Sequence, residues 1–143
     1  MAKSMRHRCR ILVMQILYAL EFGHQKPDDV FSYVINEFGD DVSDGTFLKE
    51  LFDGVASKKK LIDAAIEKAA PDWPLAKIAL MDLTILRMGV FEILFDDEIP
   101  DLVAVNEAID VAKEFGGYNN AKFVNGVLSN IMNNKAAFKK NKK

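Results

Sequence analysis

Residues 75–95 read LAKIALMDLTILRMGVFEILF, and this stretch decides the fold. Apolar residues stand at most of its positions instead of following a single helical stripe. A helix that is hydrophobic around much of its surface is buried among other helices. Pro74 precedes the stretch and an acidic run, residues 96–98, follows it. The sequence therefore predicts a central helix from Leu75 to about Phe95, packed on several sides.

The flanking sequence predicts amphipathic helices on both sides of this stretch. Apolar residues recur at spacings of three and four, and no sustained alternation indicates a strand. The other expected helices run over about 4–22, 27–38, 44–70 and 100–115, and from Asn119 or Asn120 to beyond Ile131. Gly54 is expected to bend or divide the third of these. We predict an all-α protein of about six or seven helices in two packed halves.

The length of 143 residues predicts one domain. We place the boundary between the two halves at Pro71–Pro74, because the two prolines break a helical pattern there. The expected halves cover about 4–70 and 75–134, and a basic tail covers 135–143.

The formal net charge of −2 hides a separation of charge along the chain. Residues 1–20 and 115–143 contain only basic charges, whereas all 21 acidic residues lie between them. If the fold brings the two ends together, they form a positive patch on an acidic body. Such a patch attracts polyanions by electrostatic steering and counterion release. The alternative is that the terminal charges only solubilise the chain ends.

The sequence RHRCR at residues 6–10 concentrates positive charge on the first predicted helix. Four cationic or titratable residues fall on one stripe of that helix, beside its apolar face: Lys3, Arg6, His7 and Arg10. We expect this stripe to remain exposed, while Arg8 points elsewhere and Tyr18 lies on the His7 side. Arginine binds phosphate through two parallel hydrogen bonds, and an aromatic ring stacks on an unpaired base. The pattern favours single-stranded RNA.

A secretory signal is the alternative interpretation of this N-terminus. Gln15 and Tyr18 interrupt the apolar run, and no small-residue cleavage site follows it. No other stretch approaches the roughly 20 apolar residues of a membrane span. Cys9 is the single cysteine, which excludes an internal disulfide and agrees with a reducing compartment. We expect a cytoplasmic protein without membrane contact.

Motifs of catalysis are absent from the sequence. It contains neither a phosphate-binding GxxxxGK[ST] loop nor an HExxH pair. His7, His24 and Cys9 are too few for a convincing zinc site. We therefore expect no catalytic residue, no metal and no cofactor.

The sequence GGYNN at residues 116–120 is a second candidate site. It leads into the last predicted helix, and Lys122 lies in the first turn of that helix. Backbone N–H groups at a helix N-terminus favour an anion. The alternative is an ordinary turn in which an asparagine caps the helix.

Three groups of motifs resemble the bacterial NusB family of transcription antitermination factors. They are Arg8-x-Arg10 with QILY at 15–18; ILRMGVFEIL at 85–94 with DEIP at 97–100; and VAVNEA at 103–108, AKEFG at 112–116 and KFVNGVL at 122–128. The third group is the most specific. The similarity extends from the first helix to about Ile131, although residues 24–70 match mainly in helical pattern.

The resemblance implies an all-helical NusB-like fold without catalysis. Members of the family bind the boxA element of nascent ribosomal or phage RNA together with NusE, a ribosomal small-subunit protein. The complex helps RNA polymerase to read through terminators. The positions that match the RNA side of the family are Arg6, His7, Arg8, Arg10, Tyr18, Asn119, Lys122 and Phe123. Asn119 replaces an aspartate of many members, which should help RNA binding, and Asp82 matches the NusE-facing side.

Alternatives remain at several of these positions. For Phe123 the alternative is a place in the hydrophobic core. For Asp82 the equally weighted alternative is an inward-facing carboxylate that is paired with another group. The whole chain is alternatively a helical interaction module without RNA affinity, for example a homodimer that buries the arginines. NusB-like domains also precede RNA methyltransferase domains, but 143 residues leave no room for a cofactor-binding sheet.

Overall fold

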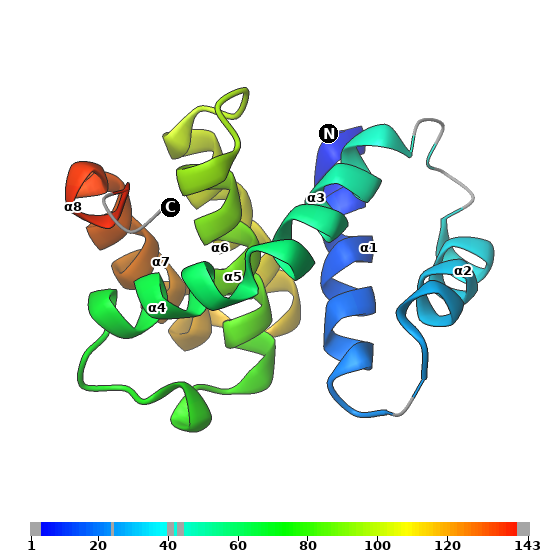
Figure 1. Ribbon diagram of the computed structural model, residues 1–143, viewed down its shortest axis with the longest axis horizontal. Coiled ribbons are helices and arrows are strands. Elements are labelled where there is room, and N and C mark those ends of the chain that lie inside the picture. The colour runs from blue at the N-terminus through cyan, green and yellow to red at the C-terminus, as the bar shows by residue number, and fades with distance from the viewer. Residues whose placement is uncertain (1–3, 24, 40–41, 43–44, 140–143) are drawn as a thin grey trace. The chain divides into compact units, whose positions relative to one another are not determined.

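The computed structural model describes residues 4–23, 25–39, 42 and 45–139. This part of the chain is helical, with no strand in it, so the predicted all-α class is confirmed. The elements are α1 (Met5–Leu20), α2 (Pro27–Phe38), α3 (Thr46–Ser57), α4 (Lys59–Ala69), the 3₁₀ turn η1 (Leu75–Lys77), α5 (Leu80–Phe95), α6 (Asp101–Phe115), α7 (Tyr118–Asn133) and α8 (Lys135–Lys139) (Figure 1). Lys3, His24 and residues 140–143 lie outside the described residues.

The chain divides into two compact units, residues 1–53 and 54–143. The division falls inside α3 and not at Pro71–Pro74, where the sequence pattern predicts it. The reason is that α4 packs against α5 and α7 and so belongs to the second unit. The third predicted helix is two helices, α3 and α4, and they separate at Lys58 instead of at Gly54.

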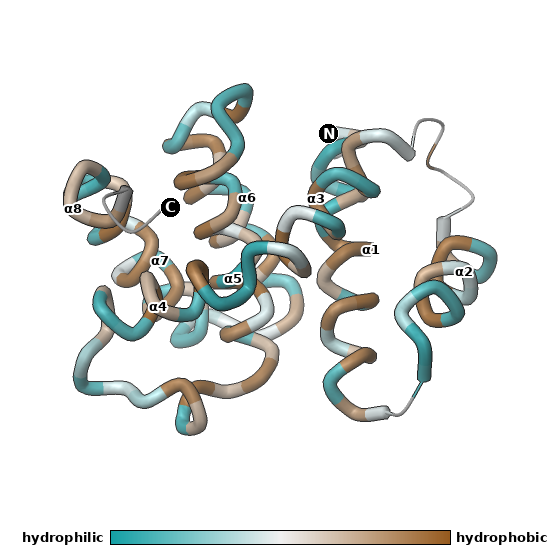
Figure 2. The backbone as a smooth tube through the Cα atoms, in the orientation of Figure 1, coloured by the Kyte–Doolittle hydropathy of each residue, from teal (hydrophilic) through white to brown (hydrophobic). Residues whose placement is uncertain are grey.

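In the first unit, α1 packs against α2. The Ser4 hydroxyl caps α1 by accepting a hydrogen bond from the His7 backbone N–H at 3.1 Å. Pro27 opens α2 as predicted, because its missing N–H costs nothing in the first helical turn. Hydrophobic residues recur along α1 (Figure 2), and α2 buries Val30 and Val34.

In the second unit, α5 is the central helix and contacts α4, α6 and α7 (Figure 1). Its buried apolar residues are Leu83, Ile85, Leu86, Met88, Val90, Ile93 and Leu94. The predicted central helix is confirmed, but it begins at Leu80, and η1 occupies residues 75–77. Gly89 allows α7 to approach closely, because a Cβ atom there would lie 2.6 Å from Cδ1 of Leu128.

Ion pairs join helices of the second unit. Arg87 of α5 donates to both carboxylate oxygens of Asp63 in α4, at 2.8 and 3.2 Å. Lys135 of α8 binds the Asp101 carboxylate of α6 at 2.9 and 3.0 Å, and Phe138 is buried. The start of the predicted basic tail is therefore a packed helix and not a free extension.

Candidate nucleic-acid interface

The basic residues of α1 are not equally exposed. Arg6 is exposed, and its guanidinium carbon lies 4.7 Å from the centroid of the Phe47 ring. His7 and Arg10 are only 1% and 3% exposed, and the Arg10 guanidinium lies 5.0 Å from the same ring centroid. The prediction that the whole stripe stays exposed is wrong for these two residues. The physical reason is that packing covers more of α1 than its apolar stripe, so neighbouring polar residues are buried with it.

Arg8 and Tyr18 lie at opposite ends of α1. Arg8 is partly exposed, and its Nη2 donates a hydrogen bond to the Phe38 carbonyl oxygen at 2.7 Å. This bond places a cation at the C-terminus of α2, where the helix dipole favours positive charge. Tyr18 lies roughly 18 Å further along the helix axis than Arg6, at 1.5 Å per residue. It is half-buried and contacts the exposed Phe22 ring edge-on, at 4.9 Å between centroids.

The N-terminus of α7 forms the second part of the candidate interface. Gly117 precedes it with φ at +92°, a value that suits glycine and strains other residues. The prediction that Asn119 or Asn120 caps the helix is wrong. Gly117 is the capping residue, and no described side chain caps it. The N–H groups of the first turn are left for solvent or an anion.

A polar hollow of about 550 Å³ lies between α6 and α7. Its lining residues are Asn106, Ile109, Asp110, Lys113, Tyr118, Ala121, Lys122 and Asn125. The Lys122 ammonium lies 5.8 Å from the centroid of the Tyr118 ring, which is 70% exposed. Asn119 is exposed in the same turn. The hollow thus combines two ammonium groups, the Asp110 carboxylate, amide groups and an exposed aromatic face.

The position of Phe123 is compatible with both of the roles that the sequence left open. It is half-buried, and its ring meets the Trp73 ring at 5.9 Å between centroids with an interplanar angle of 69°. Trp73 is 53% exposed, so the pair presents aromatic surface. The sequence pattern at residues 71–74 predicted only a helix break and missed Trp73. A tryptophan between two prolines was the available signal.

Asp82 does not face outward as the partner-side prediction required. It is 7% exposed, and its Oδ1 accepts a hydrogen bond from Nδ2 of Asn120 at 2.9 Å. The structure agrees with the alternative, an inward-facing and paired carboxylate. Burial raises the pKa of Asp82, and the hydrogen bond from Asn120 opposes that rise.

Asp82→Asn is expected to change how stability depends on pH. Because burial raises the pKa of Asp82 above its ordinary value of 3.8, the native protein binds a proton at higher pH than the unfolded chain does. The contribution of Asp82 to the wild-type free energy of unfolding therefore falls as pH rises from about 3.8 through the raised pKa. Above the raised pKa this contribution is constant. Urea unfolding at a series of pH values should show that the free energy of unfolding of the variant rises relative to that of the wild type over this pH range. A pH-independent difference would contradict the raised pKa.

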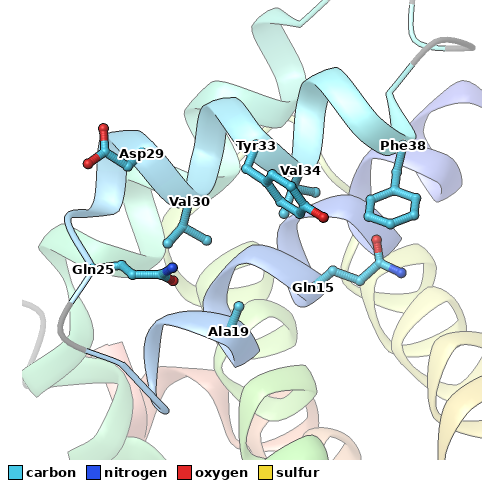
Figure 3. A pocket seen from close by; sticks show the side chains of 8 residues that line it. All are labelled: Gln15, Ala19, Gln25, Asp29, Val30, Tyr33, Val34 and Phe38. Atoms are coloured by element: carbon cyan, nitrogen blue, oxygen red, sulfur yellow. The ribbon is translucent and has the colours of Figure 1, made fainter.

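An apolar groove of about 450 Å³ lies in the first unit, between α1 and α2 (Figure 3). Gln15 and Ala19 reach it from α1, and Tyr33 and Phe38 reach it from α2. The Oε1 atom of Gln15 is buried and accepts no hydrogen bond from the described residues. A buried acceptor without a partner costs about 1–3 kcal/mol.

Gln15→Met is accordingly expected to raise the free energy of unfolding by about 1 kcal/mol, because it removes that acceptor and keeps the side-chain shape. Chemical denaturation measures the change. Gln25→Met is the control, since the Gln25 side chain lines the same groove but is exposed. A destabilised Gln15→Met protein would show that the amide makes a stabilising interaction.

Two kinds of feature are not found among the described residues. They contain no group of three or more His, Cys, Asp or Glu side chains that could hold a metal ion. None of their helices combines the length and the apolar character that crossing a bilayer requires.

An all-helical fold with two basic, aromatic regions is typical of a nucleic-acid-binding protein. Comparison with known proteins identifies the family to which the chain belongs. Residues 7–133 match the NusB family model. The chain belongs to the NusB family.

Curated relatives and solved structures cover most of the chain. The transcription antitermination protein NusB of Caldicellulosiruptor saccharolyticus is 39% identical over 123 residues, which are 82% of this chain and 94% of the relative. NusB of Dehalococcoides mccartyi is 33% identical over 126 residues, 88% of each chain. The structure of T. maritima NusB has a TM-score of 0.79 and 28% identity, covering 94% of both chains. A structure of the antitermination factors NusB and NusE in complex with double-stranded RNA has a TM-score of 0.81 and 25% identity, covering 90% of this chain and 96% of its match.

Proposed function

We propose that this chain is a transcription antitermination factor that binds RNA together with NusE and helps RNA polymerase to read through terminators. The observation that carries the proposal is the match of residues 7–133 to the NusB family. The related complex of NusB and NusE with RNA supports both proposed partners. The chain would act without catalysis, metal or cofactor, in the cytoplasm where nascent RNA is made.

Each unit contributes its own residues to the proposed RNA contacts. In the first unit these are Arg6, Arg8 and Tyr18; in the second they are Asn119, Lys122 and Phe123. Arginine and lysine would bind phosphates, and the aromatic rings would stack on bases. Tyr118, which lies in the GGYNN motif, and Trp73, which the sequence did not single out, extend the stacking surface. His7 and Arg10 are buried, so we assign them to the packing of α1 and not to direct RNA contact.

The proposed RNA is single-stranded boxA of ribosomal RNA operons. Stacking on aromatic side chains needs bases that are not already stacked in a duplex, which favours a single strand. NusE is the proposed protein partner, and the acidic middle of the chain suits a basic ribosomal protein. The related complex contains double-stranded RNA, so both RNA forms belong in the test.

Fluorescence anisotropy with labelled boxA RNA tests the proposal. The titration compares a single strand, its duplex and a scrambled strand, each with and without NusE, at two salt concentrations. We expect the boxA strand to bind more tightly than the scrambled strand, NusE to strengthen that binding, and high salt to weaken it. Equal affinity for all strands would overturn the boxA assignment. A stable dimer in sedimentation that ignores RNA would favour the interaction module instead.

A further inference from the structure

The hydrogen bond between Asp82 and Asn120 connects the central helix to the turn that carries the proposed RNA residues. Asp82 lies in the first turn of α5, and Asn120 lies in the first turn of α7, 38 positions along the chain. Asn119 precedes Asn120 directly, and Lys122 follows two residues later. The orientation of Asn120 therefore affects both neighbours, because one helical turn moves as a unit.

The α7 turn needs such a connection. It follows Gly116 and Gly117, and Gly117 has a positive φ that few residues adopt. No described side chain caps the helix. The turn therefore has no side-chain cap of its own, and the bond to Asp82 is a side-chain restraint that adds to the packing of α7 against α5 and α6.

Gly116 leaves the space that Asn120 occupies. A Cβ atom at Gly116 would lie 2.9 Å from Nδ2 and 3.0 Å from Cβ and Cγ of Asn120. These contacts are closer than ordinary van der Waals distances, and they involve atoms near the Asn120 backbone. The absence of a side chain at residue 116 thus permits the amide to reach Asp82.

We propose that Asp82 is a positioning residue for RNA: through Asn120 it holds the first turn of α7 so that Asn119 and Lys122 face the RNA. This inference rests on the proposed RNA-binding function. It gives Asp82 a role that its burial permits, in place of direct contact with a protein partner. RNA affinity of the chain alone then depends on Asp82, although the carboxylate itself touches no RNA.

Variants at the two positions separate the hydrogen bond from the charge. Asp82→Ala and Asn120→Ala each remove the bond, and each should weaken binding of the boxA strand by about threefold to tenfold without NusE. Asp82→Asn removes the charge but keeps an acceptor, so it should bind almost as the wild type does. Asn120→Asp faces Asp82 with a second carboxylate and should bind weakly. The exchanged pair Asp82→Asn with Asn120→Asp restores a donor and an acceptor, and it should recover affinity.

The double variant of Asp82→Ala with Asn120→Ala completes a thermodynamic cycle. If the two residues act only through their bond, the double variant should bind RNA no more weakly than either single variant. Further loss in the double variant would show that Asn120 contacts RNA directly, and would overturn the positioning role. Tighter binding by both Asp82→Ala and Asp82→Asn would show that charge repulsion dominates, and would also overturn it.

Two further measurements distinguish positioning of the α7 turn from a general loss of packing. Hydrogen exchange of the α7 first turn in the RNA-free protein should rise in Asp82→Ala and Asn120→Ala, but not in Asp82→Asn. Thr84→Val is the matched control, since it removes a buried hydroxyl from the same helix, where Thr84 donates to the Leu80 carbonyl at 2.8 Å. It should leave RNA affinity unchanged. NusE affinity should be unchanged in Asp82→Ala.

The outcomes separate the positioning role from the proposed function. If the wild type binds RNA but Asp82→Ala binds equally well, the positioning role is wrong and the RNA-binding function stands. If Asp82→Ala loses NusE and keeps RNA, Asp82 is a partner contact. If the wild type binds no RNA, the proposed function fails and the positioning role fails with it, whereas the exchange measurement still reports whether the bond orders the turn.

Discussion

Replacing Arg6 and Lys122 together by glutamate is expected to weaken RNA binding by about a hundredfold near 0.1 M salt, roughly tenfold for each position. Both side chains are exposed, one in each unit, and each reversal replaces attraction to a phosphate by repulsion. Each lost phosphate contact should also reduce the slope of log affinity against log salt by about one. Anisotropy titrations over a salt series measure both quantities.

The control for this variant is Lys26→Glu with Lys60→Glu. It changes the net charge by the same amount and also uses one exposed lysine from each unit, at positions outside the proposed contacts. We expect it to reduce RNA affinity much less. Equal losses in the two double variants would mean that RNA responds only to total charge, and that Arg6 and Lys122 have no special role.

Arg10 is deliberately absent from this variant. The sequence alone would have paired Arg6 with Arg10, but the Arg10 side chain is buried beside Phe47. A glutamate at residue 10 would place a carboxylate where the guanidinium packs, which destabilises the fold. Loss of RNA binding in that variant would then report unfolding and not a lost contact.

Gly89→Val is expected to cause the largest loss of stability, about 3 kcal/mol, because a side chain there overlaps the α7 helix. The Cβ atom alone would meet Leu128 at 2.6 Å, and Leu128 is fully buried and cannot move aside easily. A loss of this size lowers the melting temperature of a domain of this length by about 10 °C. Circular dichroism during heating and urea unfolding measure it.

Gly126→Ala is the matched control for Gly89→Val. Gly126 lies in α7, and an added Cβ atom meets nothing within 4 Å. Its φ is not positive, so alanine fits the backbone and should stabilise the helix by about 0.5–1 kcal/mol. If Gly89→Val were as stable as the wild type, the close packing of α5 on α7 would be wrong.

The helices were predictable from sequence where local chemistry marks their ends. Pro27 fixes the start of α2, and the apolar stretch at 75–95 identifies the buried helix, although that helix begins only at Leu80. The break between α3 and α4 was placed at Gly54, four residues too early. Gly54 instead allows the Phe91 ring to approach, since a Cβ there would lie 2.2 Å from it. A glycine in a helical pattern thus marked a close contact, which the sequence alone could not distinguish from a bend.

The candidate site was predictable only in part. The GGYNN motif at 116–120 and Lys122 indicated the α7 turn, and the arginines indicated α1. Periodicity along one helix shows which residues share a face, but it does not show how widely other elements cover that face, so the burial of Arg10 was missed. The bond between Asp82 and Asn120 joins side chains 38 positions apart, and no local pattern reveals such a pair.

Transcription in vitro tests the central claim most directly. The template carries boxA upstream of a terminator, and the reaction contains RNA polymerase, NusE and the accessory factors of an antitermination complex, with or without this chain. We predict that adding the chain increases the fraction of transcripts that pass the terminator, that a mutated boxA abolishes the increase, and that the Arg6→Glu, Lys122→Glu variant fails to produce it. The same readthrough with and without the chain on the boxA template would contradict the account.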